Sequence, residues 1–205
     1  MSNQIKLIET LTGKYKDFSL SMSKQKFYLN KAGYLPGIKL KSCVIGPYNN
    51  DEGYLNLKGI VLTGADLENS WLCWIYMNNC YLEGANMKNV EANGIFLQNS
   101  NLSGCNMEGA KMINAQFQNS KLQGSNLSKT TLNGANFEGA DLEGCDFSFS
   151  ELTNVIFKNA NIKNANFKNA LLGQNSTIKE ASNFKDAINI NFNYVNNISE
   201  IIEDL

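Results

Sequence analysis

Two consecutive five-residue units, Ala135-Asn136-Phe137-Glu138-Gly139 and Ala140-Asp141-Leu142-Glu143-Gly144, repeat one pattern of residue types. Each unit has a small residue, a polar residue, a large apolar residue and two residues that are common in turns. The same phase continues in both directions from this stretch and covers residues 55–174. A period that is held over such a length indicates a repeat architecture.

Large apolar residues occupy the centre of almost every unit. From Leu57 to Leu172 there are 24 centres, and each is Leu, Met, Phe or Ile except Ala92. A leucine at position 92 is expected to be tolerated unless Val90 and Ile95 already fill its space. The second residue after the centre is Gly or Asn in 20 of the 24 units, which favours the positive φ angle of the third residue of a type II turn. The exceptions are Trp74, Lys129, Phe149 and Gln174.

A five-residue period excludes the two common regular structures. Five residues advance by about 500° around an α-helix, so the apolar centres would be spread over every face. In a flat strand an odd period would place successive centres on opposite sides. We therefore expect a short extended piece and a corner in each unit, with the centre and the small residue two positions before it both pointing inward. Repeated corners close the chain into coils that stack as a solenoid.

The units resemble those of the pentapeptide-repeat family, whose motif is A(D/N)LXX. Matching units include 65–69 (Ala-Asp-Leu-Glu-Asn), 85–89 (Ala-Asn-Met-Lys-Asn) and 140–144 (Ala-Asp-Leu-Glu-Gly). The resemblance implies an all-β fold, a right-handed quadrilateral β-helix with four units per turn. On that geometry 24 units form six coils with an axial length of about 29 Å.

The flanking sequence divides the chain into three expected parts: an N-terminal cap segment (1–32), the repeat β-helix (33–174) and a C-terminal cap with a helix (175–205). Between residues 33 and 47 the repeat runs in another phase, with Leu35, Leu40 and Ile45 as centres. The seven residues 48–54 then shift the phase by two, so we expect them to form a loop that projects from a corner.

Short amphipathic helices are expected at both ends, over residues 2–12 and 197–205. The second has an apolar side that could cap the last coil. The family resemblance implies an alternative, in which this side forms a two-fold dimer. The residues concerned are Ile198, Ile201, Ile202 and Leu205.

Composition argues against an enzyme and predicts no catalytic residues, cofactor or metal. The chain has no histidine and no arginine, and it has no glycine-rich phosphate-binding motif. Paired carboxylates such as Asp66 with Glu68 flank inward centres, so they are expected to face solvent. Cys80, Cys105 and Cys145 occupy inward small positions and are interpreted as core residues. With no signal peptide and no apolar span, a reducing cytoplasm is the expected location.

Aromatic residues cluster at outward positions of the first two main coils and form a candidate protein-binding patch. Positions four units apart should stack, which places Tyr76 beneath Phe96. Residues 14–31, which carry Phe18, Phe27 and Tyr28, could instead fold back over the patch. Candidate binding residues in the patch and in the loop are Trp71, Trp74, Tyr76, Tyr81, Phe96, Tyr48, Asp51 and Glu52.

Two functions remain after these exclusions. The first is a rigid protein-binding or scaffold solenoid that acts on a partner of unknown identity. The second follows from the resemblance, since some family members protect DNA gyrase or topoisomerase IV from quinolones or toxins by imitating DNA. Residues 55–174 hold ten acids and eight lysines that share the same surface, so the charge pattern favours the scaffold. Direct nucleic-acid or membrane binding is not expected.

Overall fold

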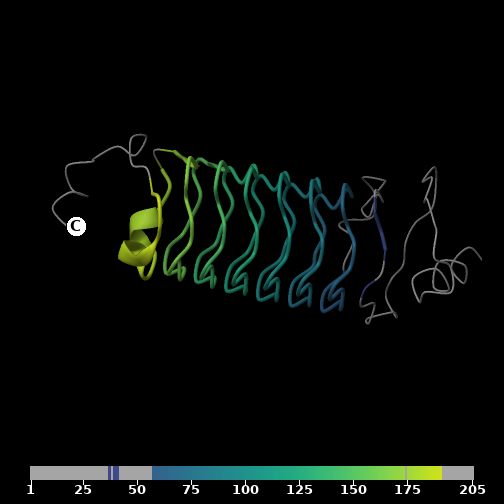
Figure 1. The fold of residues 1–205 in the computed structure, drawn as a ribbon. Coiled ribbons are helices and arrows are strands. Elements are labelled where there is room, and N and C mark those ends of the chain that lie inside the picture. Colours follow the sequence, from purple (N-terminus) through teal and green to yellow (C-terminus); the bar gives the residue numbers. More distant parts are fainter. Residues whose placement is uncertain (1–36, 38, 42–56, 174, 191–205) are drawn as a thin grey trace, which may run out of the picture.

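The computed structural model describes residues 37, 39–41, 57–173 and 175–190. Most of these residues form narrow coils that stack side by side (Figure 1), and isolated parallel β-bridges join neighbouring coils. Two strands are long enough to be assigned, β1 (Glu151–Leu152) and β2 (Leu171–Leu172), and they pair in parallel. Two short 3₁₀ helices follow, η1 (Ile178–Glu180) and η2 (Phe184–Asp186).

A constant register between neighbouring coils defines the solenoid. Four bridge ladders begin at Val61, Asp66, Trp71 and Tyr76, and each residue in them pairs with the one four units further along the chain through the regular part of the repeat. Each coil therefore contains four five-residue units, one on each of four sides. The all-β solenoid expected from the sequence is confirmed.

The corners have the geometry that the repeat predicts. The carbonyl of a centre accepts a hydrogen bond from the amide three residues later, as in Ala135 N–H to Leu132 O at 2.8 Å. Positive φ angles occur at all 23 positions spaced by five from Gly59 to Asn169. Trp74, Lys129 and Phe149 adopt them too, although only Gly and Asn do so at low cost. The coil register therefore overrides the local preference of these three residues.

The interior is filled by the centres and the small residues that precede them. In the C-terminal half phenylalanines stack along the axis, with ring centroids 4.7 Å apart for Phe117 and Phe137 and 5.1 Å apart for Phe147 and Phe167. All four rings are fully buried. Because burial of a phenylalanine contributes roughly 1.5–3 kcal/mol, these stacks are a major part of the core energy.

Polar inward side chains are satisfied by the backbone carbonyls of the centres. Ser125 Oγ donates to Leu102 O at 2.7 Å, and Cys145 Sγ donates to Leu122 O at 3.0 Å. Burial raises the pKa of the Cys80, Cys105 and Cys145 thiols to about 12, so they stay protonated at neutral pH. Their expected role as core residues is confirmed.

Both ends of the described solenoid depart from the regular four-unit spacing. Lys39 pairs with Asp66, which lies further along the chain by one coil plus the seven residues predicted from the phase shift. The segment 48–54 itself lies outside the described residues. At the other end Ser182 pairs with Asn161 and Ile188 with Asn166, so residues 175–190 continue two ladders at wider spacing. Phe184, Ala187 and Ile190 pack against the core there.

The small centre Ala92 is flanked by two large buried side chains, Val90 and Ile95. Ala92, Val90 and Ile95 are all fully buried, whereas one coil later Met112 is accompanied by the smaller Ala110 and Ala115. We expect Val90 and Ile95 to occupy the space that a larger centre would need. Ala92→Leu should then lower the free energy of unfolding by about 1–3 kcal/mol through overpacking.

Adding Val90→Ala and Ile95→Ala to Ala92→Leu should recover a large part of that loss, since this triple variant resembles the Met112 arrangement. Chemical denaturation of the single and triple variants checks both expectations. A single variant as stable as the wild type would show that the site has spare room.

Candidate functional site

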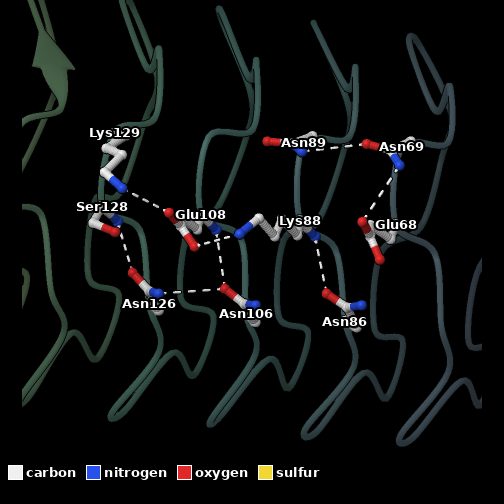
Figure 2. A network of polar contacts seen from close by, with 10 residues as sticks. All are labelled: Glu68, Asn69, Asn86, Lys88, Asn89, Asn106, Glu108, Asn126, Ser128 and Lys129. Carbon is white, nitrogen blue, oxygen red and sulfur yellow. Dashed lines mark hydrogen bonds and ion pairs between the residues drawn. The ribbon is translucent and has the colours of Figure 1, made fainter.

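Stacked Asp and Asn side chains cover one side of the coil. In the ladder that starts at Asp66, Asn86 Nδ2 donates to Asp66 Oδ1 at 3.0 Å, and Asn126 Nδ2 donates to Asn106 Oδ1 at 3.3 Å. The asparagine oxygen also accepts a backbone amide two residues later, as in Glu108 N–H to Asn106 Oδ1 at 3.2 Å (Figure 2). The side chain at the polar position of the motif therefore forms hydrogen bonds both to the adjacent coil and within its own corner, and stabilises both.

Glu108 is the centre of a charged cluster on the same side (Figure 2). Its two carboxylate oxygens accept from Lys88 Nζ and Lys129 Nζ, both at 2.8 Å. These two ammonium groups lower the pKa of Glu108 to about 2. Two coils earlier, Glu68 pairs with Lys41 at 2.8 Å. This side of the first coils is therefore close to neutral and offers no continuous acidic surface among the residues described.

The depressed pKa of Glu108 predicts a pH-dependent contribution to stability. The carboxyl has an ordinary pKa of 4.5 and a folded pKa of about 2, so its contribution is complete above about pH 4.5 and is lost as the pH falls toward 2. Thermal melts of wild type and Glu108→Gln should differ at pH 7, with the wild type more stable, and should converge near pH 2.

Glu138→Gln is the matched control for this experiment, because Glu138 is exposed and forms no ion pair among the described residues. Its melting temperature should follow that of the wild type at every pH. A Glu108→Gln variant with an unchanged pH profile would contradict the assigned role of the cluster.

Carboxylates gather without lysines in one band further along the solenoid. No lysine lies between Lys129 and Lys158, and the ion pairs that join two described residues fall within residues 41–129. The carboxylates are distributed over all four sides, and some accept hydrogen bonds from asparagine, such as Asp141 from Asn161 at 3.0 Å. The members of this acidic band are Glu138, Asp141, Glu143, Asp146 and Glu151.

The predicted aromatic residues lie in the first two coils but on different sides. Tyr76 and Phe96 belong to one ladder and stack with ring centroids 4.5 Å apart, as the four-unit spacing predicts. Trp71 and Tyr81 belong to two other ladders, and Trp74 lies at a corner. Trp74 is 45% exposed and Tyr81 51% exposed, whereas the other three are half-buried. We refer to these five residues as the aromatic set.

Trp74 packs against the next coil. A Cβ atom built on Gly94, the equivalent corner one coil later, would lie 2.3 Å from Trp74 Cε3, so the indole covers the glycine. Gly94 is buried for this reason, although corner residues are usually exposed. The indole therefore lies against the next coil, while 45% of the residue is exposed.

Substitution of Gly94 tests this contact. Gly104→Ala meets open space and should cost only the strain of a positive φ, about 1–2 kcal/mol. Gly94→Ala has the same strain and must also displace the indole, so its free energy of unfolding should fall further, by about 1–3 kcal/mol.

In a Trp74→Ala background the two alanine substitutions should cost the same, which a double-mutant cycle measured by urea denaturation can show. Equal costs in the wild-type background would mean that the indole does not occupy this position.

The other predicted site residues are not among those that the structure describes. Tyr48, Asp51, Glu52 and the C-terminal residues Ile198, Ile201, Ile202 and Leu205 lie outside the described residues.

Three exposed apolar residues of the repeat were missed by sequence reasoning: Ile113 (37%), Phe149 (56%) and Leu171 (50%). For two of these residues the sequence contains a feature that could have indicated exposure. Phe149 replaces Gly or Asn at a corner, and Leu171 belongs to the ladder from Trp71, which has no Asp or Asn at its bridging positions.

Membrane-spanning helices and metal-binding clusters are both absent from the residues that the structure describes. There is no helix there with the length and apolar character needed to cross a bilayer. Nor do His, Cys, Asp and Glu side chains come together there in groups of three that could hold a metal ion.

Stacked coils, filled interior and polar ladders define a β-solenoid repeat protein. The family model for pentapeptide repeats matches this chain in eight copies, over residues 80–115, 93–128, 110–148 and 132–174. Residues 80–174 therefore carry the repeats of the pentapeptide-repeat family. No curated protein sequence matches this chain.

Solved structures of other pentapeptide-repeat proteins are similar to parts of this chain. QnrB1, a plasmid-mediated fluoroquinolone resistance protein, is 17% identical over 74% of this chain and 84% of its own, with a TM-score of 0.31. A protein from the thylakoid lumen of Arabidopsis thaliana is 28% identical over 43% of this chain and 65% of its own, with a TM-score of 0.29. HetL from the cyanobacterium Nostoc sp. strain PCC 7120 is a protein involved in the regulation of heterocyst differentiation. It is 17% identical over 76% of this chain and 88% of its own, with a TM-score of 0.24.

Proposed function

We propose that this protein is a non-catalytic, right-handed solenoid that binds a partner protein through the aromatic set. The observation that carries the proposal is the exposure of Trp74 and Tyr81 on a surface whose other outward positions are mostly amides, hydroxyls and charges. Tryptophan and tyrosine are the residues that most often dominate the binding energy of an interface.

Rigid support makes these aromatic side chains suitable as anchors. Successive coils are joined by backbone hydrogen bonds such as Leu82 N–H to Asn101 O at 2.7 Å, directly beside Tyr81. The Trp74 indole packs on Gly94, and Tyr76 stacks on Phe96. Side chains that are already held in place lose little conformational entropy on binding, which favours affinity.

The chemistry of the surface supports a non-catalytic role. The paired carboxylates Asp66 and Glu68 are engaged locally, since Asp66 Oδ1 accepts the Glu68 amide at 3.2 Å and Glu68 pairs with Lys41. A general acid and base need a shared substrate space, which these groups do not form. Large buried side chains fill the coil interior, where a substrate would otherwise bind.

Photo-crosslinking in the source organism tests the proposed surface. A crosslinking amino acid at position 81 should capture one discrete protein, and the Trp74→Ser variant should lose most of that product. The same amino acid at position 161, in the same ladder four coils away, is the control. Identical products from both positions, or none from position 81, would contradict binding through the aromatic set.

A second candidate function is interaction with a type II topoisomerase, as the family resemblance implies. The specific observation in its favour is the acidic band, because DNA mimicry requires carboxylates where a DNA-binding surface expects phosphates. Five carboxylates without an intervening lysine form the most acidic part of the described solenoid.

A DNA gyrase supercoiling assay with ciprofloxacin distinguishes the two functions. If the protein is a topoisomerase mimic, it should restore supercoiling, and Glu138→Gln combined with Glu143→Gln and Glu151→Gln should abolish the effect. A variant with residues 48–54 replaced by a short glycine linker tests the predicted loop separately. No rescue by the wild-type protein at micromolar concentration would exclude this candidate.

The remaining features of the proposal concern the ends of the chain and its location. We propose that residues 1–32 and 175–205 act as caps of the repeat region 33–174, and that the C-terminal apolar residues either cover the last coil or join two copies. The protein is proposed to act in the cytoplasm, where its buried thiols stay reduced. Sedimentation of wild type and Ile201→Asp would show whether a dimer depends on this end.

A further inference from the structure

The aromatic set is small compared with an interface between folded proteins. It spans two coils, about 10 Å along the axis, and three sides of about 10 Å each, which gives an area of roughly 300 Å². A stable interface between two globular partners buries about 800 Å² on each. The area suits a short segment of chain better than a second folded copy.

A suitable segment is present in the same chain. Described structure begins at Gly37, whose amide donates to Thr63 O at 2.7 Å next to the first full coil. The 36 residues before it are long enough to pass along two coils, since an extended chain covers about 3.3 Å per residue. Within them, residues 14–31 carry four aromatic side chains, Tyr15, Phe18, Phe27 and Tyr28.

Charge complementarity points to the same occupant. Residues 14–31 hold five lysines and one aspartate, a net charge of +4. Residues 57–96 hold four carboxylates, of which Glu68 pairs with Lys41 and Glu91 with Lys111, so the uncompensated negative charge lies at Asp66 and Glu83. Glu83, two residues from Tyr81, accepts hydrogen bonds from Thr63 Oγ1 at 3.1 Å and Asn101 Nδ2 at 2.5 Å, and no lysine pairs with it among the described residues.

We propose that residues 14–31 lie across the aromatic set, with their aromatic side chains on Trp74 and Tyr81 and a lysine at Glu83. The inference concerns the isolated chain and does not require the proposed protein partner. If both hold, the partner and the segment compete for one surface, and binding requires release of the segment.

Intrinsic fluorescence tests the proposal directly, because Trp71 and Trp74 are the two tryptophans of the chain and both belong to the aromatic set. Combined Phe18→Ser, Phe27→Ser and Tyr28→Ser substitutions should shift the emission of the full chain to longer wavelength and increase its quenching by acrylamide. The control is Phe192→Ser with Tyr194→Ser at the other end, which should change neither quantity.

Glu83→Gln provides a second and milder variant, since the glutamine oxygen keeps an acceptor for Asn101 Nδ2 and the glutamine amide nitrogen can donate to Thr63 Oγ1. It should also increase quenching, whereas Glu143→Gln, the equivalent position three coils later, should not. Circular dichroism establishes that each variant is folded. Unchanged fluorescence in the aromatic triple variant and in Glu83→Gln would overturn the proposal, whatever crosslinking shows about a partner.

Discussion

Hydrogen bonding between coils in a fixed register of four units is the constraint on which the rest of this structure depends. Leu67 N–H donates to Asn86 O, and Asn86 N–H donates to Ala65 O, so each side of a coil is held from both directions. The register determines which side chains point into the coil, because a shift by one residue would turn the inward centres toward solvent. Stability is therefore shared between neighbouring coils, as in other solenoids.

This register also explains where local preferences are overruled. Trp74, Lys129 and Phe149 take positive φ angles that glycine or asparagine would adopt at lower cost. Lys129 is compensated by its ion pair with Glu108, and Trp74 by its packing on Gly94. Corners with large side chains are where the surface departs from the repeat, and they carry the features that distinguish this chain from a uniform solenoid.

The outer surface has two chemically different parts. Up to residue 129 acids and lysines form ion pairs between coils, whereas the five carboxylates of residues 138–151 are followed by Lys158, Lys163 and Lys168 on the next coil. The charge is thus balanced locally in the first coils and separated into bands in the later ones. A partner that recognises the aromatic set meets a nearly neutral surface, while one that recognises carboxylates would bind nearer the C-terminal end.

Much of the fold was determined by the sequence alone. The five-residue period was sufficient to predict the solenoid, the inward centres, the positive φ positions and the stack of Tyr76 on Phe96, because these depend on spacing and residue size. The offset of seven residues near the N-terminus also followed from the phase. Only the tertiary structure decided that the Trp74 indole packs on Gly94, that Glu108 links two lysines, and that residues 175–190 continue two ladders. Those features depend on which side chains from different coils come within contact distance, and a one-dimensional period does not determine side-chain direction between coils.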